Sequence, residues 1–112
     1  MEPDQALARL NDDERRWVQS FRDQVSQALG PRLRDLRIFG SKLTGEFHDE
    51  SDIDILVLVE HLDQATRVRV MEIARSLSYW LEPHVIDFDS YHTPVSRATG
   101  FYKEMRKASA RI

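Results

Sequence analysis

Apolar residues recur every three or four positions in two long stretches of the chain, which is the spacing of one face of an amphipathic helix. The first stretch follows Asn11, a good N-cap residue, and Glu14 lies three positions later, the arrangement of a capping box. The sequence therefore predicts a helix over residues 11–29, which Gly30 and Pro31 would end.

Three further segments have the pattern of β-strands. Residues 34–39 alternate between apolar and polar, whereas residues 53–59 are almost continuously apolar, as expected of a central strand covered on both faces. Asp63 is a plausible N-cap for the second helix, and Pro83 is expected to end it. Residues 84–88 then predict a third strand.

The last segment, residues 93–112, is expected to be helical and broken near Gly100. The order of elements predicts one α/β domain over residues 1–112, with helices packed on a three-stranded sheet for which mixed pairing is allowed. Its core would span residues 34–88, between the N-terminal helix and the C-terminal helical segment.

Composition excludes several classes of protein. The chain has 112 residues, of which 41% are hydrophobic and 31% charged, as in an ordinary globular domain. It has no cysteine, which excludes disulfides and thiolate chemistry and fits a reducing cytoplasm. Its beginning lacks the pattern of a signal peptide, and no stretch approaches the roughly 18 apolar residues of a membrane span. A cytoplasmic location without membrane contact is expected.

The net charge of −3 bears on the choice of partner. A general nucleic-acid binder normally carries a basic excess, so nucleic acid is not expected as a direct ligand. Two basic clusters could nevertheless contact phosphates, and solvated surface charge is the simpler interpretation of each. They are Arg32, Arg34 and Arg37 near the first strand, and Lys103, Arg106, Lys107 and Arg111 near the C-terminus.

Two carboxylates precede and enter the apolar central strand. Asp52 and Asp54 are two residues apart, so in a strand they would share one face, separated by roughly 6–7 Å. Two convergent carboxylates can hold one or two Mg²⁺ ions. The turn at Gly40 and Ser41, just upstream, can present backbone N–H groups to a phosphate. The combination indicates metal-dependent chemistry on a nucleoside triphosphate.

A third carboxylate, Asp87, falls within the third predicted strand. A lone buried carboxylate costs several kcal/mol unless it is paired or binds a cation. If the third strand lies beside the second, Asp87 would approach Asp52 and Asp54 and complete a three-carboxylate site. A structural ion pair of Asp87 with His84 or an arginine is the alternative.

These residues resemble the signature of the DNA polymerase β-like nucleotidyltransferase superfamily, and their spacing is most similar to its minimal nucleotidyltransferase (MNT) branch. The resemblance covers roughly residues 36–88. The residues that carry it are Gly40, Ser41, Gly45, Ser51, Asp52, Ile53, Asp54 and Asp87.

The resemblance implies a role for each position and the nucleotidyltransferase fold. It implies ATP as substrate, with one or two Mg²⁺ ions held by Asp52, Asp54 and Asp87 as the catalytic carboxylates, the last also activating the acceptor hydroxyl. Members of the branch often carry an arginine where this chain has Thr44, so Lys42 is the candidate for that charge. The implied nucleotide-binding residues are Gly40, Ser41, Lys42 and Ser51.

The resemblance also implies a partner. The MNT branch is commonly paired with a small helical HEPN-domain ribonuclease toxin, which the MNT protein neutralises, in some cases by transferring AMP to a tyrosine of the toxin. A nucleotidyltransferase that modifies a small hydroxylated molecule is one alternative. An antitoxin that blocks its partner by binding alone is another, and a structural domain that binds no nucleotide is a third.

Simpler interpretations exist for parts of this pattern. Ser51 and Asp52 are both residues that favour turns and caps, and Gly40 with Ser41 would also suit an ordinary turn. The histidines show no metal-ligand spacing and are expected to be structural or surface residues. They are His48, His61, His84 and His92.

Overall fold

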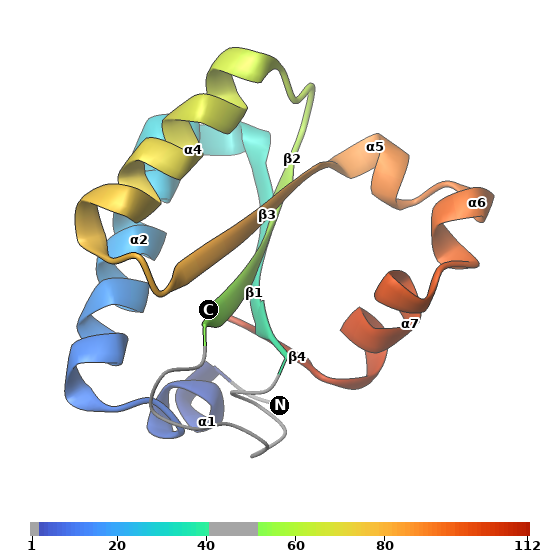
Figure 1. Ribbon diagram of the computed structural model, residues 1–112. Helices are drawn as coiled ribbons and strands as arrows, with labels where there is room; N and C mark the ends of the chain where they lie inside the picture. Colours follow the sequence, from blue (N-terminus) through green and yellow to red (C-terminus); the bar gives the residue numbers. More distant parts are fainter. Residues whose placement is uncertain (1–2, 41–51) are drawn as a thin grey trace.

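One mixed β-sheet of four strands organises the molecule, in the order β3-β2-β1-β4 (Figure 1). The computed structural model describes residues 3–40 and 52–112. β1 pairs antiparallel with both β2 and β4, whereas β2 and β3 are parallel. The predicted α/β fold is confirmed, with one strand more than predicted. The strands are β1 (Leu33–Phe39), β2 (Ile53–Val59), β3 (Leu81–Asp87) and β4 (Ser109–Arg111).

Helices lie on both sides of this sheet (Figure 1). α2 and α4 cover one face, and the three short helices α5, α6 and α7 lie on the other side. None of the described helices is long and apolar enough to cross a membrane. The helices are α1 (Pro3–Ala8), α2 (Asp12–Leu29), α4 (Gln64–Leu77), α5 (Phe88–Tyr91), α6 (Pro94–Arg97) and α7 (Gly100–Lys107), with a 3₁₀ turn η1 (Gly30–Arg32).

The two long helices begin where the sequence predicts. Asn11 Oδ1 accepts from the backbone N–H of Glu14 at 2.8 Å, and the backbone N–H of Asn11 donates to Glu14 Oε1 at 3.0 Å. Asp63 caps α4 by accepting from the backbone N–H of Thr66 at 2.8 Å. Both caps satisfy N–H groups that a helix leaves without internal partners.

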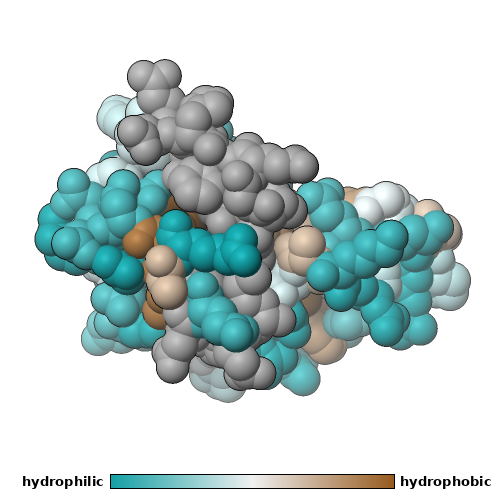
Figure 2. Space-filling view, turned by 90° about the horizontal axis from the view of Figure 1, so that it is seen from below, coloured by the Kyte–Doolittle hydropathy of each residue, from teal (hydrophilic) through white to brown (hydrophobic). Residues whose placement is uncertain are grey.

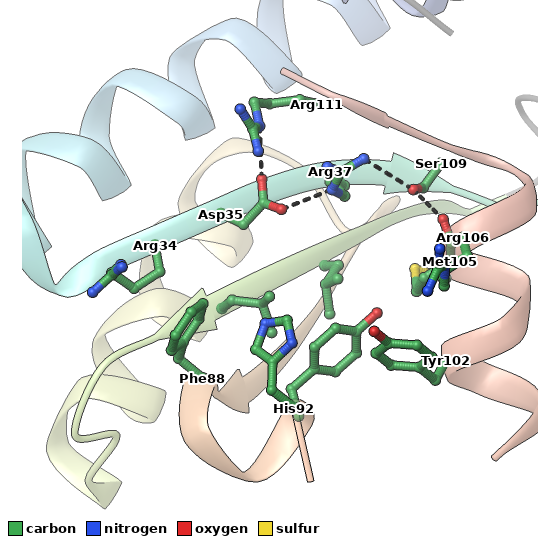
Figure 3. A pocket seen from close by; sticks show the side chains of 13 residues that line it. Arg34, Asp35, Arg37, Phe88, His92, Tyr102, Met105, Arg106, Ser109 and Arg111 are labelled. Atoms are coloured by element: carbon green, nitrogen blue, oxygen red, sulfur yellow. Dashed lines mark hydrogen bonds and ion pairs between the residues drawn. The ribbon is translucent and has the colours of Figure 1, made fainter. Parts of the chain in front are cut away.

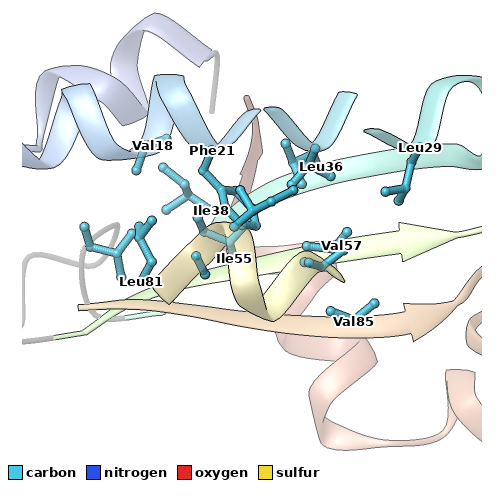
Figure 4. Close-up of a cluster of buried hydrophobic side chains, with 14 of the residues drawn as sticks. Val18, Phe21, Leu29, Leu36, Ile38, Ile55, Val57, Leu81 and Val85 are labelled. Carbon is cyan, nitrogen blue, oxygen red and sulfur yellow. The ribbon is translucent and has the colours of Figure 1, made fainter. Parts of the chain in front are cut away.

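The larger hydrophobic core lies between the sheet and the pair α2 and α4 (Figure 4). Alternate residues of β2, including Ile55 and Val57, point into it, together with Phe21 of α2. The intervening residues Leu56 and Leu58 belong to a second cluster with Tyr91, Tyr102 and Met105. The central strand is therefore covered on both faces, as its continuous apolar run predicts.

The segment around Pro83 differs from the prediction. α4 ends at Leu77, and β3 begins at Leu81 rather than at His84. Pro83 lies inside β3, opposite Ile55 of β2. A proline is compatible with a strand at the edge of a sheet, because one side of that strand needs no ladder hydrogen bond. The prediction that Pro83 ends the helix is therefore wrong.

The last strand and the first helix are not predicted by local sequence pattern. β4 has three residues, and its Ala110 pairs with Ile38 of β1. A three-residue strand shows too little alternation to be recognised, and its pairing joins distant parts of the chain. The predicted break near Gly100 is confirmed, because α6 ends at Arg97 and α7 begins at Gly100.

Candidate active site

Asp54 lies at the beginning of β2, on the side of the sheet that faces α5–α7. It is opposite Phe39 of β1 and Glu82 of β3 in the sheet register. Its side chain is 29% exposed, so the carboxylate is reachable from solvent yet partly enclosed by the fold. Asp52 lies one residue before β2 and is exposed. The predicted pair of carboxylates is therefore at the start of the central strand.

Gly40 supports the position of Asp54 through close contact. Its φ is +84°, a conformation that favours glycine. A Cβ atom at this position would lie 2.7 Å from Asp54 Oδ2, so no side chain fits without moving the carboxylate. The turn that the sequence predicts at Gly40 thus packs directly against the acidic residue. Ser41, Lys42, Thr44, Gly45 and Ser51 lie outside the described residues.

Replacing Gly40 with alanine should lower the free energy of unfolding by about 1–3 kcal/mol, because the residue must keep a left-handed conformation while its Cβ meets the carboxylate. Urea denaturation would measure the change. Gly100→Ala is the matched control, since a Cβ there meets nothing within 4 Å and the φ is ordinary. Equal stability of the two variants would contradict the close contact.

His84 of β3 is the neighbour of Asp54 that the sequence did not identify. Its Nε2 lies 3.2 Å from Asp54 Oδ1. The hydrogen bond that the Asp54 carboxylate accepts raises the pKa of His84, with burial acting in the opposite direction. The interpretation of His84 as a structural or surface residue is therefore incomplete. Alternation along β3 could have placed it on the same side as Asp54, but only with the strand register known.

The His84–Asp54 contact predicts a pH-dependent stability. A pKa that is higher in the folded state than in the unfolded state gives stabilisation that is fully present below about pH 6.5 and is lost as the pH rises through the folded value. His84→Gln should therefore lower the thermal midpoint more at pH 6 than at pH 9. Thermal denaturation of both proteins at the two pH values measures this. The same difference at both pH values would contradict the charged contact.

Asp87 lies at the opposite end of the sheet from Asp54. It is opposite Val59, five positions along β2 from Asp54, which is roughly 16 Å of strand. β2 and β3 are parallel, so the end of β3 cannot meet the start of β2. The structure does not bring Asp87 to the other two carboxylates, and the predicted three-carboxylate cluster is wrong.

Asp87 instead has a structural role. It accepts from the backbone N–H of Leu62 at 3.0 Å and caps α5 by accepting from the backbone N–H of Ser90 at 3.2 Å. These hydrogen bonds, that from Leu62 first, hold the pKa of Asp87 below its usual value. The alternative ion pair of Asp87 with His84 is not formed either, because His84 contacts Asp54.

The rings of Phe39 and Phe101 pack against the imidazole of His84, the Phe101 ring at 6.2 Å. The ring of Phe39 lies 5.0 Å from that of His84 and 5.5 Å, edge to face, from that of Phe101 of α7. Packing against two rings restricts the imidazole, so His84 can orient the Asp54 carboxylate.

Figure 2, which views the molecule from the end at which α1 lies, shows a described surface that is mostly hydrophilic, with small hydrophobic patches.

The oxygen ligands present at this site suit a hard divalent cation such as Mg²⁺. Asp54 and Asp52 supply carboxylates at the start of one strand, and neither is fully buried. Within residues 3–40 and 52–112, no three histidine, aspartate or glutamate side chains converge on one point. The described residues therefore provide a small acidic site whose remaining ligands would come from water and substrate.

Comparison with known proteins identifies the class of this fold and site. The sequence profile of the family described as "Nucleotidyltransferase domain" matches residues 18–108. The chain therefore belongs to the nucleotidyltransferase domain family, and its enzyme class is that of nucleotidyltransferases.

One relative, from Methanocaldococcus jannaschii, is named for protein adenylyltransferase activity. It is 33% identical over 45 residues, which is 40% of this chain and 46% of the relative. The match thus spans less than half of that protein's length.

Three solved structures share the fold. A nucleotidyltransferase-like protein from Sulfolobus solfataricus has a TM-score of 0.52 and 24% identity, over 70% of this chain and 74% of its own. A toxin–antitoxin structure with AMP-PNP has a TM-score of 0.56 and 21% identity, over 90% and 72%. A Shewanella oneidensis complex of a tri-AMPylated HEPN toxin with its MNT antitoxin has a TM-score of 0.50 and 19% identity, over 85% and 70%.

Proposed function

We propose that this protein transfers AMP from ATP to a hydroxyl group of a protein, in a Mg²⁺-dependent reaction, and that it acts as the antitoxin of a HEPN-type ribonuclease toxin. The observation that carries the proposal is the carboxylate of Asp54, held at the start of β2 between the glycine turn at Gly40 and the imidazole of His84. Family membership supports the class of reaction.

The geometry suggests how the residues would divide the work. Asp54 and Asp52 would hold the cation, which neutralises charge on the triphosphate when bound. His84 would position the Asp54 carboxylate through its contact with Oδ1, and Gly40 leaves the space that this carboxylate occupies. The acceptor oxygen would attack the α-phosphorus, the bond to the β-phosphate oxygen would break, and pyrophosphate would leave. The hydroxyl proton would pass to solvent.

The related proteins support the choice of nucleotide and partner. The relative from Methanocaldococcus jannaschii is named as a protein adenylyltransferase, and one structural neighbour contains AMP-PNP. The Shewanella oneidensis neighbour is an MNT antitoxin together with a HEPN toxin that carries three AMP groups.

A specific observation favours a second candidate, an antitoxin that blocks its partner by binding alone. Asp87 caps α5 at the far end of the sheet, and the residue that contacts Asp54 from β3 is His84 rather than a carboxylate. An acidic site without a third carboxylate would hold metal less tightly, because each carboxylate adds charge and ligands.

The deciding experiment is intact-mass spectrometry of a HEPN-type toxin after incubation with this protein, ATP and Mg²⁺. A mass gain of one or more AMP units supports the catalytic proposal. If the toxin stays unmodified but forms a stable complex and loses its ribonuclease activity, the binding-only candidate is correct. If neither modification nor a complex is found, the antitoxin proposal is wrong.

A further inference from the structure

A cavity of about 640 Å³ lies between the sheet and the helices α5 and α7, next to the acidic site but not lined by Asp54 (Figure 3). This volume is within the range of sites that hold small molecules. Leu56 and Leu58 of β2 form part of its apolar lining. Arginines of β1, β4 and α7 line it together with the aromatic rings of α5 and α7. The cavity thus combines concentrated positive charge with planar apolar surfaces.

The cavity brings together two residues from each of the basic clusters of the sequence, the one near the first strand and the one near the C-terminus. Arg34 and Arg37 come from β1, Arg111 from β4 and Arg106 from the last turn of α7. Four guanidinium charges are set against two carboxylates, that of Asp35, which lines the cavity, and that of Glu60, which pairs with Arg34 at 3.3 Å. This leaves +2 around the cavity, with histidine counted as neutral. The whole chain carries −3. An acidic protein that concentrates positive charge in one cavity is expected to attract an anion there.

Asp35 holds two of these arginines in fixed orientations. Its carboxylate accepts from Arg37 Nε at 2.7 Å and from Arg111 Nε at 3.1 Å. Both contacts use Nε, and among the described residues the only other hydrogen bond is from Arg37 Nη1 to Ser109 at 3.3 Å. The remaining Nη groups can therefore donate to a ligand. Guanidinium groups suit phosphate oxygens because they can donate two parallel hydrogen bonds.

Aromatic rings face this charged wall from the other side of the cavity (Figure 3). The guanidinium of Arg34 lies 4.6 Å above the ring of Phe88, and the ring of His92 lies 4.6 Å from the same ring. Tyr91 and Tyr102 pack together at 4.9 Å. Burial is the main cause that raises the pKa of Tyr91. Tyr91 and Tyr102 are buried, whereas Phe88 and His92 are only half-buried, so a planar ring could stack on the latter two.

We propose that this cavity is a nucleotide-binding site that holds a phosphate group with its arginines and a base with its aromatic rings. Arg37 is opposite Leu56 in the sheet. Leu56 is two residues after Asp54 in β2 and on the same face, which places them roughly 7 Å apart. Asp54 itself does not line the cavity. The proposed site therefore adjoins the acidic site without including Asp54, and it stands whether or not the proposed AMP transfer occurs.

Two kinds of ligand carry a phosphate group next to a base, a free mononucleotide and the phosphorylated end of an RNA strand. The test measures binding of AMP, of adenosine, of inorganic phosphate and of a 5′-phosphorylated oligoadenylate by isothermal titration calorimetry, without metal. AMP should bind at least about tenfold more tightly than adenosine or phosphate alone, because its phosphate can contact the arginines while its base contacts the aromatic rings. Tighter binding of the oligoadenylate than of AMP would identify RNA as the source, and equal or weaker binding a free nucleotide.

Variants distinguish AMP binding in this cavity from binding to charges elsewhere on the surface. Arg106→Gln, alone and with Arg111→Gln, should weaken AMP binding, the double variant by at least about tenfold, since each removes a charged donor. Arg106 forms no ion pair or hydrogen bond with any described residue, so its replacement should leave the fold intact. Lys107→Gln is the matched control for charge, because Lys107 is exposed and does not line the cavity. It should change the affinity by less than about twofold.

Several outcomes would overturn the proposal. One is the absence of AMP binding at millimolar concentration, and another is an equal loss of AMP affinity in Lys107→Gln and Arg106→Gln. A third is displacement of AMP by a glutamate-rich peptide that binds more tightly, which would identify an acidic polypeptide as the ligand. Loss of AMP binding in Asp54→Asn would instead place AMP at the acidic site. Binding that depends on the arginines but persists in Asp54→Asn supports the cavity, even if no AMP transfer to a toxin is ever observed.

Discussion

Replacing Asp54 with asparagine is expected to lower the rate of the proposed AMP transfer to a toxin by at least about a hundredfold, because the proposed metal ligand is lost where charge must be stabilised in the transition state. The side chain keeps its shape, so it can still fit beside Gly40, which approaches closely enough to leave no room for a Cβ atom. The measurement is the rate at which AMP-modified toxin accumulates, followed by intact-mass spectrometry.

Asp87→Asn is the informative comparison for this prediction. Both substitutions remove one carboxylate charge, but Asp87 lies at the other end of the sheet and caps α5. Its replacement should therefore leave the rate within about threefold of the natural protein, with some loss of stability, since its effect is that of a weakened helix cap. A hundredfold loss of rate in Asp87→Asn with an intact fold would mean that Asp87 takes part in the reaction.

Replacing Phe21 with alanine is expected to destabilise the fold by about 3–5 kcal/mol, through the lost burial of the ring and the cavity that remains. Phe21 has no exposed surface and packs in the core that α2 and α4 form with the sheet (Figure 4). Since domains of this size are stable by only about 5–15 kcal/mol, the variant would retain little margin. Equilibrium denaturation in urea measures the change.

Val95→Ala provides the control for the core prediction. Its side chain is 81% exposed on α6, so its truncation should change the free energy of unfolding by less than about 0.5 kcal/mol. A loss below about 1 kcal/mol in Phe21→Ala would show that the helix layer contributes far less to stability than its burial indicates.

The sequence predicts that Asp52 and Asp87 both lie beside Asp54, and the structure places only Asp52 there. The case of Asp87 shows what local sequence pattern cannot predict. The condition set for the three-carboxylate site, that the second and third strands be neighbours, is met, and Asp87 lies within a strand as predicted. Because the two strands are parallel, the start of β2 lies beside the start of β3, where His84 is found. Asp87, at the end of β3, is therefore far from Asp54. Two connected strands with a helix between them favour this parallel arrangement, so the strand direction could have been argued from the α4 crossover.

The sequence by itself determined the caps of α2 and α4, the extent of β2 and the position of a carboxylate at its start. These features depend on residues within a few positions of one another, so periodicity and capping chemistry are sufficient to predict them. Only the tertiary structure decided that His84 contacts Asp54, that β4 joins the sheet, and that arginines from β1, β4 and α7 line one cavity. Strand direction, register and helix packing bring these groups together over long sequence separations, which no local pattern records.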